Sequence, residues 1–209
     1  MEETKTGTTT LAIKGKDSIV IAADKRVTRG YEVVDTEFHK VLKLTSDVMV
    51  AIAGSVADIQ RLIKYMKAEI KLSELKLGRK LLVKEIAAKL TATVFSNIRT
   101  PSIITPITAF ILAGNDINGN HVFEISPGGS IIEVRTFVAD GSGGIYAKSV
   151  LEDSFEENMN TTNLVNLAKR AINVSLKKDT ASGNGFLIFS ISEKGIKLEA
   201  DEKISTGIY

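Results

Sequence analysis

A glycine followed by three threonines, Gly7 to Thr10, stands just before a run that predicts a β-strand. A threonine hydroxyl is a poor nucleophile unless a base removes its proton. If Thr8 were the first residue of the chain, its own α-amine, with an ordinary pKa near ~8, would accept that proton. Cleavage after Gly7 would create such an end. Taken alone, the same residues are better explained as a strand-favouring segment beside a flexible glycine.

An acidic residue stands at the end of one apolar run, and a basic residue stands at the start of another. Asp24 closes the run from Ser18, and Lys40 opens the next short one. A lysine buried against Asp24 near Thr8 would lower the pKa of a hydroxyl or a neighbouring amine. The alternative is that Asp24 is a turn residue, while Lys40 and the cations of 25–26 face solvent, as most lysines do.

Three later segments contain groups that are also candidates for a functional site. Gly54 ends an apolar run, and a backbone N–H at a strand-to-helix corner can stabilise an oxyanion. The segment 140–144, Asp-Gly-Ser-Gly-Gly, precedes an expected helix and is similar to an anion-binding loop. It lacks the glycines of a nucleotide-binding P-loop. The segment 179–183 follows the last expected helix and also fits an ordinary cap and turn.

The hydrophobic pattern indicates the elements that must position these residues. Alternation and apolar runs predict strands in the first third at 10–14, 18–24, 31–35, 40–44 and 48–53. Apolar residues three or four apart then predict helices at 56–70 and 81–98. Further strands are expected at 109–113, 121–125 and 131–137, helices at 145–157 and 162–176, and strands at 185–192 and 197–200.

The order of these elements predicts an α+β fold in one domain. Simple alternation of strands and helices would indicate a parallel sheet, whereas helices that arrive in pairs indicate two antiparallel sheets with a helix layer on each outer face. Few polar residues interrupt the strands, so both faces of each sheet are expected to be covered.

Composition excludes several classes of function. The 209 residues contain 27 basic and 25 acidic side chains, a net charge of +2, which favours neither nucleic acid nor a membrane as partner. There is no cysteine, and the two histidines have no ligand spacing around them, so neither a metal nor a cofactor is expected. No apolar stretch reaches the roughly 20 residues that span a bilayer, and the polar amino terminus is no secretion signal. We expect a cytoplasmic protein.

Taken together, in this order and at these spacings, the segments resemble the β subunits of archaeal-type 20S proteasomes, a threonine protease family of N-terminal nucleophile hydrolases. Gly7-Thr-Thr-Thr10 is similar to the family's processing site, and Ala22-Ala-Asp-Lys-Arg26 to its Asp-x-Arg block. Lys40 stands at the family's distance from the nucleophile. Gly54 and the segments 141–143 and 179–183 match later blocks. The resemblance extends from Gly7 to about Glu199.

This resemblance implies a four-layer αββα sandwich, a leader of residues 1–7 and a mature domain of residues 8–209. Thr8 would attack the Gly7–Thr8 bond and then substrate, while Asp24 and Lys40 position it and tune its protonation. The resemblance assigns support of the α-amine to Ser142, Asp179 and Ser182, and the oxyanion hole to the Gly54 N–H. Two departures from the family pattern are Asp140 and Asn184.

The same resemblance assigns the substrate pocket and the partners. The expected pocket walls are all apolar and predict a hydrophobic residue on the amino-terminal side of the cut (P1): Val27, Phe38, Ile52 and Val56. The implied partners are other β subunits in a seven-fold ring, α-subunit rings, an ATPase acting through them, and unfolded polypeptide substrates. Two alternatives remain, a non-catalytic structural β subunit and a subunit of the related bacterial two-component protease, whose rings would be six-fold.

Overall fold

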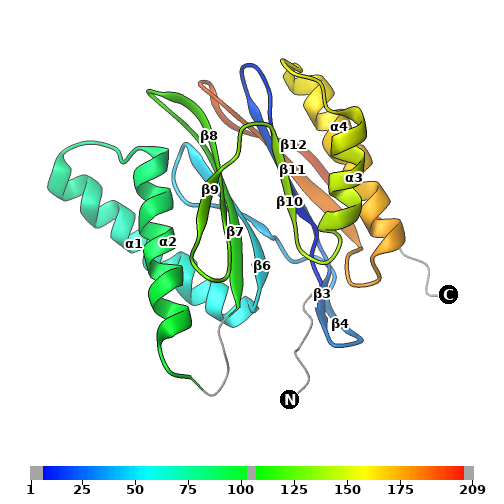
Figure 1. The fold of residues 1–209 in the computed structure, drawn as a ribbon, viewed down its shortest axis with the longest axis horizontal. Coiled ribbons are helices and arrows are strands. Elements are labelled where there is room, and N and C mark those ends of the chain that lie inside the picture. Colours follow the sequence, from blue (N-terminus) through cyan, green and yellow to red (C-terminus); the bar gives the residue numbers. More distant parts are fainter. Residues whose placement is uncertain (1–6, 103–106, 205–209) are drawn as a thin grey trace.

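Two five-stranded antiparallel sheets are stacked between two pairs of helices (Figure 1). The computed structural model describes residues 7–102 and 107–204. One sheet has the order β10-β1-β2-β11-β12, formed by β1 (Thr10–Lys14), β2 (Ile19–Asp24), β10 (Phe137–Asp140), β11 (Gly185–Ser192) and β12 (Gly195–Lys203). The other has the order β5-β6-β7-β8-β9, formed by β5 (Val41–Lys43), β6 (Val48–Gly54), β7 (Thr108–Asp116), β8 (Gly119–Ile125) and β9 (Ile131–Glu133).

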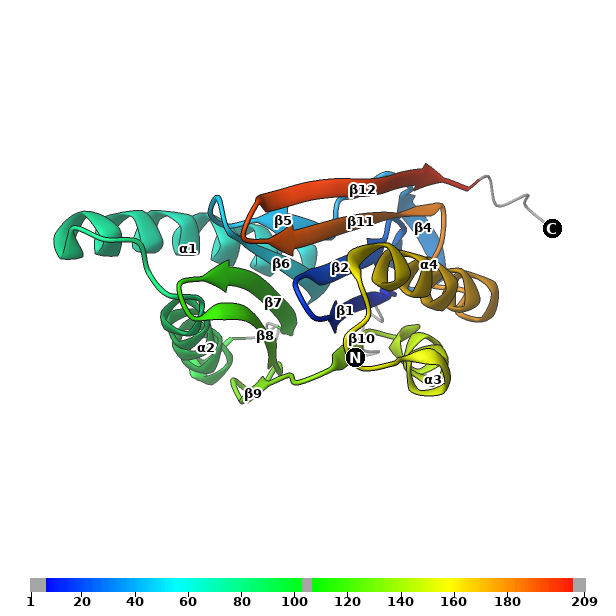
Figure 2. The ribbon, with the colours of Figure 1, turned by 90° about the horizontal axis from the view of Figure 1, so that it is seen from above.

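The helices cover the outer faces of the two sheets, as Figures 1 and 2 show from two directions. The second sheet is covered by α1 (Val56–Leu77) and α2 (Val83–Arg99), and the first by α3 (Gly144–Ser154) and α4 (Thr161–Lys178). A short hairpin of β3 (Val27–Arg29) and β4 (Glu32–Asp35) extends beyond the sheets. The predicted αββα sandwich is confirmed.

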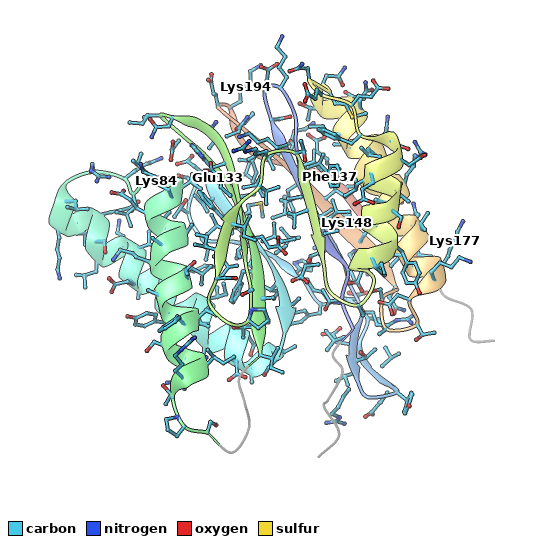
Figure 3. All side chains as sticks on the ribbon, viewed as in Figure 1. Lys84, Glu133, Phe137, Lys148, Lys177 and Lys194 are labelled. Carbon is cyan, nitrogen blue, oxygen red and sulfur yellow. The ribbon has the colours of Figure 1, made fainter. Side chains whose placement is uncertain are left out.

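Period-2 alternation explains why both faces of each sheet are buried. In β1, Leu11 and Ile13 face α3 and α4, while Ala12 faces the other sheet. In β6, Val50 contacts the α1–α2 layer, and Ala51 lies between the sheets. Side chains fill the space between the layers in Figure 3. The result is three apolar layers, which hold the strand ends in fixed positions.

One predicted strand is in fact two strands. The run 131–137 was expected to be a single strand, but it divides into β9 and β10, which belong to different sheets. The apolar pattern continues through Val134 and Val138, both buried, so hydrophobicity alone does not mark the residue at which the chain crosses between sheets. The strand β3 was not predicted, because three residues are too few for a periodic signal.

In the described ranges, no helix is long and apolar enough to cross a membrane. Over the same residues, no group of three or more histidine, aspartate or glutamate side chains is arranged to hold a metal ion.

Candidate active site

Both sheets contribute strand ends to one site. Because β1 and β2 are antiparallel, the start of β1 lies beside the end of β2, with Thr10 opposite Ala23. The Asp24 N–H donates to the Thr9 carbonyl at 3.1 Å and extends this pairing towards Thr8. Lys40 comes from the other sheet, where its carbonyl accepts from the Ile52 N–H at 3.0 Å. The packing of the sheets therefore brings Lys40 to the amino-terminal end of β1.

The Asp24 carboxylate is the central acceptor of the site. Its Oδ1 accepts from the Lys40 ammonium at 2.8 Å and from the Thr9 N–H at 2.9 Å. Its Oδ2 accepts from the backbone N–H groups of Arg26 at 3.0 Å and Gly183 at 3.1 Å. Both Asp24 and Lys40 are buried. These donors satisfy a carboxylate that water does not reach, and they fix the direction of the Lys40 side chain.

Burial shifts both members of this pair away from their charged forms. Desolvation raises the pKa of the Asp24 carboxyl, against the opposing effect of Lys40 and the backbone donors. Desolvation likewise lowers the pKa of the Lys40 ammonium, against the attraction of Asp24. A lysine with a lowered pKa releases its proton more readily than an exposed one, so Lys40 is suited to proton transfer.

Thr8 and Lys40 meet at the carbonyl group of Gly7. The Thr8 hydroxyl donates to the Gly7 oxygen at 2.6 Å, and the Lys40 ammonium donates to the same oxygen at 3.0 Å. The Gly7 N–H donates to the Thr28 hydroxyl at 2.9 Å. A Cβ on Gly7 would lie 1.9 Å from the Ala181 Cβ, so only glycine fits this position. The rest of the expected leader, residues 1–6, lies outside the described residues.

The three residues expected to support the α-amine form one hydrogen-bonded group. The Asp179 Oδ2 accepts from the hydroxyls of Ser142 at 2.6 Å and Ser182 at 2.7 Å. The Thr8 N–H in turn donates to the Ser142 hydroxyl at 3.2 Å. The predicted departure at Asp140 does not disturb this group, because its carboxylate accepts from the adjacent Gly141 N–H.

Two glycines allow close approach of the chain at the site. At Gly141 φ is +87°, and a Cβ would lie 2.2 Å from the Thr8 carbonyl oxygen, which the Gly143 N–H binds at 3.1 Å. At Gly54 φ is +119°, and a Cβ would lie 2.1 Å from the Ile107 carbonyl oxygen. Any other residue at either position would be strained and would collide with backbone.

A small pocket opens beside Thr8 and contains every residue expected in the substrate pocket. Its lining combines the apolar walls with the candidate reactive groups, namely Gly7, Thr8, Val27, Phe38, Lys40, Ile52, Gly54, Val56 and Ile59. Ile59, on the first turn of α1, was not predicted. Its helical spacing from Val56 is the signal that would have pointed to it.

Several contacts that hold the site together were not predicted from the sequence. The Ser182 hydroxyl donates to Asp179, so the buried Thr9 hydroxyl donates to Ser182 at 2.8 Å. Arg26 donates to Asn184, which adopts a φ of 62°, and to the Thr180 carbonyl. The alternative that the cations of 25–26 lie on a solvated surface is wrong for Lys25, which is buried.

Comparison with known proteins identifies the family of this chain. The family model for proteasome subunits matches residues 4–191. A proteasome subunit beta from Methanothermobacter thermautotrophicus is 35% identical over 208 residues, covering 99% of this chain and 97% of that protein. The proteasome subunit beta of Methanocaldococcus vulcanius is 34% identical, covering 97% and 90%. That of Haloferax volcanii is 35% identical, covering 95% and 79%. The chain therefore belongs to the proteasome subunit family, among its archaeal-type β subunits.

Proposed function

We propose that this chain is a catalytically active β subunit of the 20S proteasome core, a threonine endopeptidase that removes its own leader. The observation that carries the proposal is the meeting of the Thr8 hydroxyl and the Lys40 ammonium at one peptide carbonyl, that of Gly7. A nucleophile and a cation at the same carbonyl are the components of acyl transfer. Asp24 anchors the cation by a buried ion pair.

The first reaction is cleavage of the chain itself. The Thr8 Oγ1 attacks the Gly7 carbonyl carbon and its proton is transferred to the Thr8 nitrogen, the leaving group, while the Lys40 ammonium stabilises negative charge on the carbonyl oxygen. The Gly7–Thr8 C–N bond breaks, and an ester joins Gly7 to the Thr8 oxygen. Water then hydrolyses the ester. The products are a leader ending in the Gly7 carboxylate and a chain that begins with a free Thr8 α-amine.

The second reaction repeats this chemistry on substrate. The new α-amine occupies the position of the Thr8 nitrogen, beside the Ser142 hydroxyl. Through Ser142 it is linked to Asp179, whose negative charge stabilises a protonated amine. The amine takes up the proton of the Thr8 hydroxyl as that oxygen attacks a substrate carbonyl. It passes the proton to the leaving peptide nitrogen when the substrate C–N bond breaks, and water later hydrolyses the acyl ester. The N–H of Gly54, in the wall of the same pocket, is assigned to the oxyanion.

The assembly in which this occurs follows from the family. We infer that the chain forms a seven-fold β ring between α rings in the cytoplasm, fed with unfolded polypeptide by an ATPase acting through the α ring. Enclosing the site in such a chamber keeps it away from folded proteins. The number of subunits per ring, measured by electron microscopy of the purified particle, separates seven-fold from six-fold assembly.

The intact mass of this chain in the assembled particle tests the proposal directly. After coexpression with its α subunit, we expect the chain to lose residues 1–7 and to begin at Thr8. The physical reason is that the precursor already places the Thr8 hydroxyl and Lys40 at the bond to be cut. A complete particle that retained the full leader would contradict the proposal and would favour a structural subunit.

Cleavage is expected to be fastest after hydrophobic P1 residues. A charged P1 side chain would lose its hydration in a pocket with apolar walls, so kcat/KM for P1 leucine should exceed that for P1 glutamate by about 10- to 200-fold. Peptides that differ only at P1 provide the measurement. In the matched variant Val27→Glu, cleavage after P1 arginine should rise relative to leucine. Faster cleavage after charged residues by the unmodified particle would contradict this assignment.

A further inference from the structure

Lys25 is a buried lysine beside Asp24 for which the proposed mechanism has no use. Its side chain is 2% exposed, and its ammonium forms an ion pair with Asp201 of β12, a side chain that is 46% exposed. Through this contact Lys25 lowers the pKa of the Asp201 carboxyl. A buried ammonium costs free energy that an apolar residue of the same length avoids. This cost indicates that Lys25 does more than fill space in the core.

The backbone of Lys25 joins two segments that build the site. Its N–H lies 3.3 Å from the Gly183 carbonyl oxygen and 3.1 Å from that of Gly185, at the end of the loop that carries Ser182. Its carbonyl accepts from the Phe38 N–H at 3.1 Å. Phe38 lines the substrate pocket. A shift of the Lys25 backbone therefore moves one wall of that pocket.

The ion pair ties this backbone to the far edge of the sheet. In the order β2-β11-β12, Lys25 follows the last residue of β2 and Asp201 lies on β12, so the pair bridges across β11. A second pair, Lys203 with Glu37, joins β12 to the segment that carries Phe38. Its side chains are 69% and 62% exposed, and exposed pairs contribute little. Of the two pairs, Lys25–Asp201 is the one with a buried partner and is less screened by water.

We propose that the Lys25–Asp201 ion pair is a positioning device that determines P1 selectivity. By holding the Lys25 backbone against β12, it sets the position of Phe38 in the pocket wall. The inference rests on the proposed peptidase function. It makes Lys25 a positioning residue, because its side chain contacts Asp201 and not the substrate pocket.

Three variants, studied in the assembled particle, distinguish two roles of the Lys25–Asp201 pair. One role is to position the pocket wall, and the other is only to neutralise a buried charge. Asp201→Asn leaves a buried ammonium without an anionic partner and should impair assembly most. Lys25→Met keeps the length of the side chain and leaves only a half-exposed carboxylate in water. Adding Lys25→Met to Asp201→Asn should therefore restore assembly. Lys197→Gln, at an exposed residue of the same strand, is the matched control.

The decisive readout is P1 selectivity in the double variant Lys25→Met/Asp201→Asn. We expect the selectivity, defined as kcat/KM for a P1 leucine peptide divided by kcat/KM for a P1 alanine peptide, to fall about tenfold through a change in KM. Tenfold is the scale on which a hydrophobic pocket discriminates between side chains. We expect kcat to stay within about threefold, because Asp24 and Lys40 keep their own contacts. The inference would be overturned if the double variant assembled with unchanged selectivity or failed to assemble. Either result would leave the proposed function standing. An unmodified particle that cleaves no peptide would overturn the proposed function as well.

Discussion

Replacing Thr8 by alanine is expected to abolish peptide cleavage by particles built from this chain and its α subunit, and to leave residues 1–7 attached. In the proposed mechanism, this substitution removes the oxygen that attacks the Gly7 carbonyl and, later, the substrate. Loss of a nucleophile from an acyl-transfer site lowers kcat by about 10⁴-fold or more. The measurements are peptide hydrolysis and the intact mass of the chain.

Two further variants separate processing from turnover. A Thr8→Ser chain keeps the hydroxyl and should be processed and active. A chain expressed without residues 2–7, so that removal of Met exposes position 8, bypasses the first reaction. In that background Thr8→Ala tests the nucleophile alone. Peptidase activity unaltered by Thr8→Ala in either background would show that this chain is structural and that the catalytic site lies elsewhere in the particle.

Lys40→Met is expected to reduce both leader removal and peptide cleavage by about 10³-fold, which lies within the range for a positioned acid–base or charge-stabilising group. Methionine keeps most of the stem but removes the ammonium that contacts the Gly7 carbonyl oxygen. The Asp24 carboxylate keeps its backbone donors from Thr9, Arg26 and Gly183, so assembly should survive. The rate of leader loss and kcat for a P1 leucine peptide measure the effect.

The matched control for Lys40→Met is Lys43→Met, at an exposed lysine on the adjoining strand β5. It should leave both rates unchanged. Particle yield and thermal midpoint of the two variants distinguish lost chemistry from lost assembly. A well-assembled Lys40→Met particle with more than about a tenth of the normal kcat would show that the buried ammonium is not needed for acyl transfer.

Most elements of this fold could be predicted from the sequence, because a buried face requires apolar residues at a regular spacing. β2 is buried along its whole length, and its nearly unbroken apolar run identified it. The helices α1 and α2 were recognised from apolar residues three or four apart, which form one buried stripe on each. The pattern failed between β9 and β10, because crossing from one sheet to the other leaves the apolar spacing intact.

The candidate site could be predicted only in part from the sequence. Thr8, Asp24 and Lys40 were singled out by residue type, position and spacing, and the structure brings them together. Thr9 and Lys25 were missed because their roles depend on partners far away in the chain, Ser182 and Asp201. A threonine in a strand and a lysine after it have no local signature that distinguishes a buried contact from an exposed side chain.

The sequence by itself determined most of the strands, the helices and the chemical types of the site residues, because local periodicity and local composition encode them. Only the tertiary structure decided that the ammonium of Lys40, just before β5 of one sheet, reaches the carbonyl of Gly7, just before β1 of the other. That distance depends on how the side chains between the sheets pack, which is a property of the whole core. The same packing buries Asp24 and Lys40 and shifts their pKa values, so the protonation chemistry of the site belongs to the fold and not to any segment of the sequence.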